Sequence, residues 1–297
     1  MKISTKRPRK RPIRALEYGF HHVLRLLPVD LVSDIGALGG RIEARRNPIA
    51  DHRVRDNLSR LRPDITDSRK FERMVRRFWE NAGRCYTEFS ALSRIWGSDR
   101  ITIEGVENLD DARASGRPQI WIFPHLGNWE VIGPTLVDLG YATNGLQITQ
   151  PLRDQTRRKL VENVRRRYAD HMISPGPGSA NRIYRRLKTG GVLSIAIDEC
   201  IDGEVYGPAF GRKPRQDGNL TRTARLAMRT DAMVLIIYAV RRRPANFVIR
   251  ILPPTPIAFG SLKDEQLAEA ATALNAVVEQ IILEHIDQWF WLDDLRL

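Results

Sequence analysis

Alternation of short apolar segments with helical patterns along residues 101–251 constrains the fold more than any other feature of the sequence. The segment Gln-Ile-Trp-Ile-Phe at 119–123 is continuously apolar after its first residue, which is typical of a strand buried on both faces of a sheet. Further strand-like segments lie at 101–106, 143–149, 192–197, 232–240 and 246–252. Helical patterns occupy 107–116, 128–140, 153–172, 179–190 and 265–286. Strands that alternate with helices and end in two adjacent strands predict an α/β protein, with a mixed, mainly parallel sheet flanked by helices.

The part of the chain directly before residue 97 is predicted to be helical. Apolar residues recur at steps of three and four between residues 53 and 95, and the texture changes only after Gly97. We therefore predict three parts. A basic tail and an amphipathic helix occupy 1–45, and one domain covers 46–297, with a helical lead-in at 46–96 and an α/β core at 97–297.

Positive charge is concentrated at the N-terminus. The chain has 48 Lys and Arg against 35 Asp and Glu, a formal net charge of +13. Residues 1–60 hold 14 basic and 6 acidic side chains, whereas residues 261–297 hold 2 and 8. An excess of this kind at one end favours an anionic partner, either nucleic acid or a membrane surface, although a basic start can also serve solubility alone.

The segment behind the basic tail favours the membrane surface over nucleic acid. Its apolar residues recur at helical spacing: Ile13, Leu16, Phe20, Val23, Leu24 and Leu27. Charged residues interrupt it, so it falls short of the roughly 18 uncharged apolar residues that a spanning helix needs. A basic tail followed by an amphipathic helix is typical of a segment lying in the membrane interface. Because no zinc ligands, recognition helix or aromatic-rich strands accompany it, we expect no nucleic-acid partner.

Several familiar kinds of site are missing from the sequence. There is no Walker A loop, no Rossmann glycine fingerprint and no G-x-S-x-G turn. The two cysteines, Cys85 and Cys200, are far apart and form no metal-binding spacing with the six histidines. Asp198 and Glu199 could bind a metal only with a third ligand, which is not visible. The sequence therefore predicts a reduced cytoplasmic compartment, no disulfide framework, no metal and no bound cofactor.

The sequence His-Leu-Gly-Asn-Trp-Glu at 125–130 combines a base with a carboxylate. His125 follows the buried strand, Asn128 can cap the next helix, and Glu130 falls in that helix's first turn. A carboxylate on one ring nitrogen would fix the tautomer and raise the basicity of the other nitrogen. With no Ser or Cys nucleophile nearby, such a pair would activate a hydroxyl of the substrate, as in direct acyl transfer from a thioester to an alcohol. A histidine that merely caps or packs in a loop is the alternative.

This box, in its context, resembles the first motif of the glycerolipid acyltransferase superfamily. From about residue 14 to 297 the chain resembles the late lauroyl/myristoyl acyltransferases of lipid A biosynthesis. The similarity includes the segments RVRDNLSRLRPD, FWENAGRCYTEF, HLGNWE, LKTGGVLSIAIDE, YGPAFGRKP and WFWL, in this order. The resemblance implies a glycerolipid-acyltransferase-like domain over 46–297 and an enzyme at the cytoplasmic face of the bacterial inner membrane. It also implies acyl carrier protein, or CoA, as the carrier of the acyl co-substrate.

The resemblance assigns roles to individual residues. It makes His125 the general base and Glu130 its orienting partner, and it places Asp198 at the family's acidic position beside the active site. We count Asn128, Arg153, Arg166 and Asp198 as candidate substrate-binding residues. The sequence departs from the family at Gln150, where an arginine is usual, and at residues 293–296, where Asp-Asp-Leu-Arg replaces a His-Arg-Arg run. These departures leave the acceptor lipid open.

The sequence is therefore compatible with three functions. The first is transfer of a fatty acyl group to a hydroxyl of a lipid A precursor or a related glycolipid. The second is the same chemistry on a lysophospholipid or a phosphoinositide mannoside. The third is non-enzymatic, namely a basic peripheral protein that binds a membrane or nucleic acid.

Overall fold

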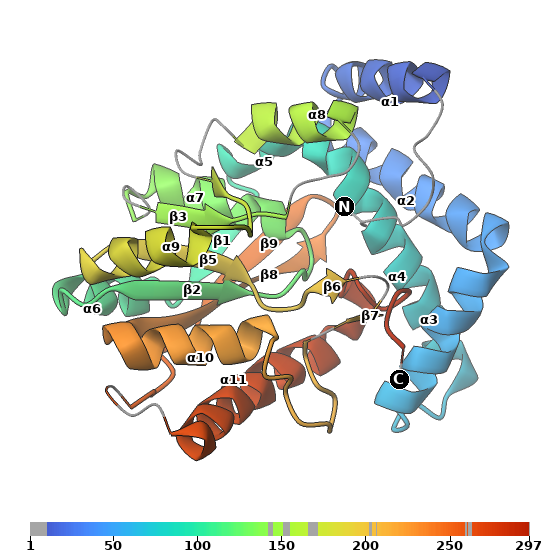
Figure 1. The fold of residues 1–297 in the computed structure, drawn as a ribbon. Coiled ribbons are helices and arrows are strands. Elements are labelled where there is room, and N and C mark those ends of the chain that lie inside the picture. The colour runs from blue at the N-terminus through green and yellow to red at the C-terminus, as the bar shows by residue number, and fades with distance from the viewer. Residues whose placement is uncertain are drawn as a thin grey trace.

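A computed structural model describes residues 11–141, 145–150, 155–165, 172–201, 204–205, 207–258, 260 and 263–296 (Figure 1). The α-helices are α1 (Arg11–Leu24), α2 (Val29–Arg46), α3 (Pro48–Leu61), α4 (Ser68–Glu88), α5 (Leu92–Trp96), α6 (Glu107–Ala114), α7 (Ile132–Asp138), α8 (Gln155–Arg165), α9 (Ser179–Lys188), α10 (Asn219–Thr230) and α11 (Asp264–Glu284). Short 3₁₀ helices are η1 (Phe89–Ala91), η2 (Trp129–Val131) and η3 (Ile286–Gln288). The strands are β1 (Ile101–Glu104), β2 (Gln119–Phe123), β3 (Gly145–Ile148), β4 (Met172–Ile173), β5 (Val192–Ala196), β6 (Cys200–Ile201), β7 (Glu204–Val205), β8 (Met233–Arg243) and β9 (Asn246–Ile251).

Seven strands form one sheet in the order β1-β9-β8-β2-β5-β3-β4. All neighbouring pairs are parallel except the hairpin of β8 and β9. The apolar segment at 119–123 is β2, which lies between β5 and β8 and has every residue buried. The predicted mixed, mainly parallel sheet is therefore confirmed. The short strand β4 and the separate hairpin of β6 and β7 were not predicted, because two-residue strands have too few residues to show a period.

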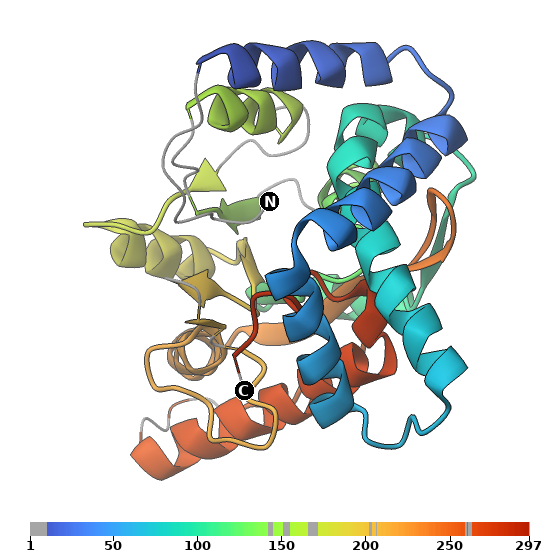
Figure 2. The same cartoon turned by 90° about the vertical axis from the view of Figure 1, so that its right-hand side faces the viewer.

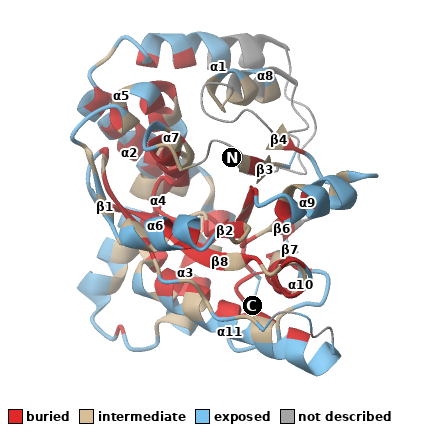
Figure 3. Cartoon of the chain, turned by 90° about the vertical axis from the view of Figure 1, so that its left-hand side faces the viewer, coloured by how far each residue is buried: buried red, intermediate tan, exposed pale blue. Residues whose placement is uncertain are grey.

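Helices flank the sheet on both sides, as predicted for this class. In Figure 1, α10 and α11 lie below the strands, while α5 and α7 lie above them. The burial colouring of Figure 3 shows the central strands β2 and β8 largely in red. Central strand residues such as Ile120, Ile122 and Leu193 are fully buried. The hydrophobic core thus lies on both faces of the sheet. This packing holds in place the strand ends that carry the candidate site.

The predicted N-terminal helix is two helices in the structure. α1 ends at Leu24 and residues 25–27 form a turn. Pro28 disfavours helical conformation at Leu27, so the helix does not continue and α2 begins at Val29. α2 packs closely on α4 through Gly36, Gly40 and Gly83. A Cβ on Gly40 would lie 1.8 Å from the carbonyl oxygen of Trp79, so only glycine permits this approach. The division at residue 45 stays a prediction.

α1 lies alongside α8 at the top of the molecule (Figure 2). Exposed large hydrophobic residues in α1 and α2 and in the turn between them are Tyr18, Phe20, Val23, Leu26, Leu31, Leu38 and Ile42. None of the helices within the described residues is both long and apolar enough to cross a membrane. Association of this segment with a membrane surface stays a prediction.

Candidate active site

Strand register places His125 beside Asp198. β2 and β5 are parallel neighbours in which Phe123 pairs with Ala196, the last residue of each strand. His125 and Asp198 each follow two residues later, so the chain carries both past the same edge of the sheet. Ligand and catalytic sites in α/β proteins form at this carboxyl edge.

Asp198 is the hydrogen-bond partner of the His125 ring. Its side chain is fully buried, with 0% exposed, and its Oδ1 lies 2.7 Å from Nδ1 of His125. The backbone N–H of His125 also donates to both carboxylate oxygens, at 3.0 and 2.8 Å. The Trp289 indole N–H donates to Oδ2 at 2.8 Å. The four contacts hold the carboxylate, and through it the imidazole, in one orientation.

These contacts determine which ring nitrogen carries the proton. A carboxylate only accepts hydrogen bonds, so the 2.7 Å contact requires the proton on Nδ1 of His125. The Trp291 indole nitrogen is 3.2 Å from the same Nδ1 and 3.1 Å from the carbonyl oxygen of Asp198. Because Nδ1 cannot donate and accept together, the indole N–H donates to the carbonyl. In the neutral ring, Nε2 of His125 is then the nitrogen without a proton, which can act as a base.

The turn that follows His125 is held by β8 and by the C-terminal segment. Gly127 has a φ of +59°, and a Cβ there would lie 2.4 Å from the carbonyl oxygen of Ala239, so both conformation and space favour glycine. The N–H of Gly127 donates to the carbonyl of Gln288 at 3.1 Å, and the N–H of Phe290 donates to the carbonyl of His125 at 2.9 Å. The base therefore sits on a fixed backbone.

The predicted hydrogen bond between Glu130 and the His125 ring is not what the structure shows. Glu130 instead accepts two hydrogen bonds from Arg165 of α8, at 3.1 Å from Nε and 2.5 Å from Nη2. The ring nitrogen that Glu130 was expected to take is occupied by Asp198. The reason is geometric: Glu130 lies in η2, whereas Asp198 lies on the neighbouring strand end. A catalytic role for Glu130 stays a prediction.

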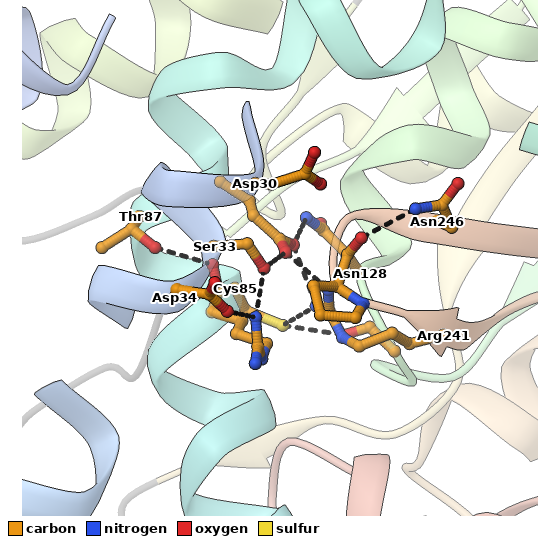
Figure 4. A network of polar contacts seen from close by, with 12 residues as sticks. Asp30, Ser33, Asp34, Cys85, Thr87, Asn128, Arg241 and Asn246 are labelled. Carbon is orange, nitrogen blue, oxygen red and sulfur yellow. Dashed lines mark hydrogen bonds and ion pairs between the residues drawn. The ribbon is translucent and has the colours of Figure 1, made fainter. Parts of the chain in front are cut away.

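Asn128 joins the turn to a buried ionic cluster (Figure 4). Its Nδ2 donates to Glu88 at 2.9 Å, and its Oδ1 accepts from the N–H of Glu130 at 3.3 Å, so it caps η2 as predicted. Glu88, with 0% exposed, also accepts from Ser33 at 2.6 Å and from both terminal nitrogens of Arg241 at 2.5 and 2.9 Å. This cluster ties α2, α4 and β8 to the turn that carries the base. Direct contact of Asn128 with substrate stays a prediction.

A cavity of about 860 Å³ opens at His125. One wall comes from α1, the end of α4 with η1, and the C-terminal segment, and it is mostly aromatic and apolar: Tyr18, Phe20, Leu24, Tyr86, Phe89, Phe290 and Trp291. Charged residues also line the cavity: Arg158, Arg165 and Glu162 of α8, Arg222 of α10, and the carboxylates Glu130 and Glu199. The cavity therefore offers both an apolar surface and charged groups.

The remaining predicted residues have different outcomes. Asp198 bonds to the histidine, and a direct contact of Asp198 with substrate stays a prediction. Arg153 and Arg166 lie outside the described residues, whereas Arg165, the last residue of α8, lines the cavity. Among the residues that the structure describes, no group of three His, Cys, Asp or Glu could hold a metal ion.

Sequence reasoning missed the roles of several residues around His125. It placed Asp198 near the active site but did not pair it with the histidine, and the equal two-residue offset from two parallel strands could have revealed that pair. The indole donors Trp289 and Trp291 were given no role at the site, yet both are buried and both donate to Asp198. Nothing in the sequence pairs Glu88 with Arg241.

Comparison with known proteins is consistent with this geometry. Residues 3–295 match the family model of the bacterial lipid A biosynthesis acyltransferases. The comparison with curated proteins gives no significant match. The family match spans nearly the whole chain and includes the ends of β2 and β5, the His125–Asp198 pair and the C-terminal tryptophans. The chain therefore belongs to the bacterial lipid A biosynthesis acyltransferase family.

Proposed function

We propose that the protein transfers a fatty acyl group from a thioester to a hydroxyl of an anionic glycolipid related to the lipid A precursors. The observation that carries the proposal is the His125–Asp198 pair at the edge of the cavity. It provides a base whose Nδ1 proton is held by a buried carboxylate at 2.7 Å. Family membership supplies acyl transfer as the reaction.

In the proposed mechanism Nε2 of His125 takes the proton of the acceptor hydroxyl as its oxygen attacks the thioester carbonyl carbon. The Asp198 carboxylate stabilises the imidazolium that forms. The tetrahedral intermediate then collapses, the carbon–sulfur bond breaks, and the imidazolium returns its proton to the departing sulfur. The products are the ester and the free thiol of the donor, and the base is regenerated.

The state of Cys85 supports direct transfer without an acyl-enzyme. Its thiol lines the cavity and donates to the carbonyl of Gly127, 2.7 Å from Sγ. Burial raises the pKa of Cys85 to about 11, so the thiol is protonated at neutral pH. Because the thiolate is the nucleophilic form, Cys85 is a poor acyl acceptor.

Two arginines of α8 that line the cavity support an anionic acceptor. Glu130 binds Arg165 through both oxygens and thereby fixes its guanidinium in the cavity wall, close to Arg158 in the same helix. These groups suit an acidic acceptor. Exposed cations on α9, which include Arg182, Arg185 and Lys188, suit an acyl carrier protein as the donor, with acyl-CoA as the alternative.

The exposed apolar residues of α1 and the turn behind it support a membrane location. Leu26 is 84% exposed and Val23 is 55% exposed. Large exposed hydrophobic residues beside a basic tail are suited to insertion among lipid headgroups. We place the enzyme at the cytoplasmic face of the bacterial inner membrane, where a lipid acceptor and a cytoplasmic acyl thioester meet.

A labelled transfer reaction tests the proposal. The purified protein is incubated with radiolabelled acyl carrier protein thioester and a bacterial membrane lipid extract, and the labelled lipid is identified. We expect label in an anionic glycolipid, and a reduction of about 10²–10⁴-fold in the His125→Ala variant. Circular dichroism confirms that the variant is folded. Undiminished transfer by a folded His125→Ala protein would contradict the mechanism, and label in a lysophospholipid product would change the acceptor.

A further inference from the structure

A line of aromatic rings leads from the base along the apolar wall of the cavity. The ring centroid of His125 is 6.3 Å from that of Phe290, which is 6.1 Å from that of Tyr86. Phe89 follows Tyr86 by three residues, so its side chain lies one helical turn further along the same face. The ring of Phe89 is in turn 6.5 Å from the ring of His21 in α1. The wall is therefore continuous from the reacting centre to α1.

At α1 this wall meets a second, smaller cavity of about 80 Å³. The residues that line both cavities are Tyr18, His21, Phe89 and Ser90. Nδ1 of His21 lies 2.7 Å from Oγ of Ser90, which joins α1 to η1 across the boundary. His21 is buried, and Leu24, one turn later in α1, lines only the larger cavity. The hydrogen-bonded pair thus forms a partition between the two spaces.

The partition is compatible with an apolar ligand on its inner side. Burial, with smaller contributions from the nearby charges of His22 and Arg25, lowers the pKa of His21 to about 4. The imidazole is therefore neutral at physiological pH, and its one described polar contact is made to Ser90. Arg158, Arg165 and Arg222, which also line the larger cavity, suit a charged headgroup.

We infer that the apolar wall holds the acyl chain and that the His21–Ser90 pair closes its far end, setting the longest chain that the enzyme accepts. The inference rests on the proposed acyl transfer. A chain whose carbonyl lies at His125 would pass Phe290, Tyr86 and Phe89 and stop at His21. Removal of the His21 ring would join the larger cavity to the smaller one and lengthen the space for the chain.

Chain-length selectivity tests this inference. The full-length protein is assayed with a series of saturated acyl thioesters that differ by two carbons, and kcat/KM is measured for each. In His21→Ala we expect the ratio of kcat/KM for the next longer chain to that for the wild-type optimum to rise about tenfold or more, because a methylene that fits or fails to fit an apolar pocket changes selectivity by about 10–200-fold. Ser90→Ala, which removes only the hydroxyl, is expected to give a smaller shift in the same direction.

Two further variants serve as controls. His22 is exposed, adjacent in sequence, and lines only the smaller cavity, so His22→Ala should leave the profile unchanged. Leu24→Phe adds volume inside the larger cavity and should favour shorter chains. A ratio of rates within one preparation does not depend on the folded fraction. Unchanged profiles in His21→Ala and Ser90→Ala, with transfer intact, would overturn the inference alone. Absence of transfer by the wild-type protein with every thioester would overturn the proposed function and this inference with it.

Discussion

Asp198 and Glu88 are both fully buried carboxylates, yet their surroundings differ in one respect. Glu88 faces the guanidinium of Arg241 at 2.5 and 2.9 Å and takes further hydrogen bonds from Ser33 and Asn128. Asp198 accepts from a backbone N–H, an indole N–H and the His125 ring, and among the described residues no Lys or Arg forms an ion pair with it.

The difference separates a structural carboxylate from one suited to catalysis. The charge of Glu88 is already balanced by the permanent cation of Arg241. Glu88 therefore joins structural elements, and its interactions do not change during a reaction. The charge of Asp198 is stabilised by neutral donors, and a positive partner arises only when His125 takes a proton. A buried carboxylate of this kind strengthens its interaction during the reaction, which is the condition for lowering a barrier.

The largest effect on activity is expected at Asp198. Asn in its place keeps the shape, but its amide nitrogen would face Nδ1 of His125 and favour the proton on Nε2, where the base must be free. We expect kcat of Asp198→Asn to fall by about 10²–10⁴-fold with little change in melting temperature. Steady-state kinetics and thermal unfolding on one preparation measure both. A near-normal kcat in Asp198→Asn would show that Asp198, like Glu88, has only a structural role.

The largest effect on stability is expected at Glu88. Glu88→Gln leaves the buried Arg241 without a countercharge, which should lower the free energy of unfolding by about 3–5 kcal/mol. Denaturant titration measures this loss, and kcat per folded molecule should stay close to wild type. Replacing both Glu88 and Arg241 by Met should recover much of the stability, since the uncompensated charge is removed. A stable Glu88→Gln protein with a collapsed kcat would contradict the assignment.

The two carboxylates also show what a sequence can predict. The buried strand at 119–123 and the histidine after it follow from local pattern alone. The partner of His125 does not, because it depends on which strand adjoins β2 and in which register, and the nearer carboxylate, Glu130, was the natural choice. Glu88 and Arg241 are 153 residues apart and meet only through packing of α4 against β8. The division of the N-terminal segment into α1 and α2 was not predicted either, because its apolar residues recur at helical spacing on both sides of the break.

Glu130 is a third carboxylate near the site, and its partner is Arg165 in the cavity lining. In Glu130→Gln the guanidinium of Arg165 loses its charged partner, and we expect the KM for the anionic acceptor to rise about tenfold, in line with the energy of hydrogen bonds to charged groups. The pH dependence of kcat/KM should not move, because His125 is not its partner. Glu162→Gln makes the same charge change in the same cavity wall and serves as the control. A pH profile of kcat/KM that shifts in Glu130→Gln but not in Glu162→Gln would show that Glu130 interacts with His125.

The smallest effect is expected at Ser33, on the side of Glu88 away from the active-site turn. Ser33→Ala removes one hydrogen bond to Glu88 and the contact with Arg84, while the bonds of Asn128 and Arg241 remain. We expect a loss of about 1 kcal/mol in the free energy of unfolding and no change in kcat. A clear loss of kcat at unchanged stability would show that the cluster tunes catalysis after all.

The tautomer of His125 shows whether Asp198 holds the proton on Nδ1, and it can be measured. ¹⁵N NMR of histidine-labelled protein, with the resonances of His125 assigned by comparison with His125→Gln, reports which ring nitrogen carries the proton. We expect the neutral His125 ring of the wild-type protein to carry its proton on Nδ1, and the ring in Asp198→Asn to change toward a proton on Nε2. A neutral wild-type ring with its proton on Nε2, or a tautomer unaffected by Asp198→Asn, would contradict the pairing of His125 with Asp198.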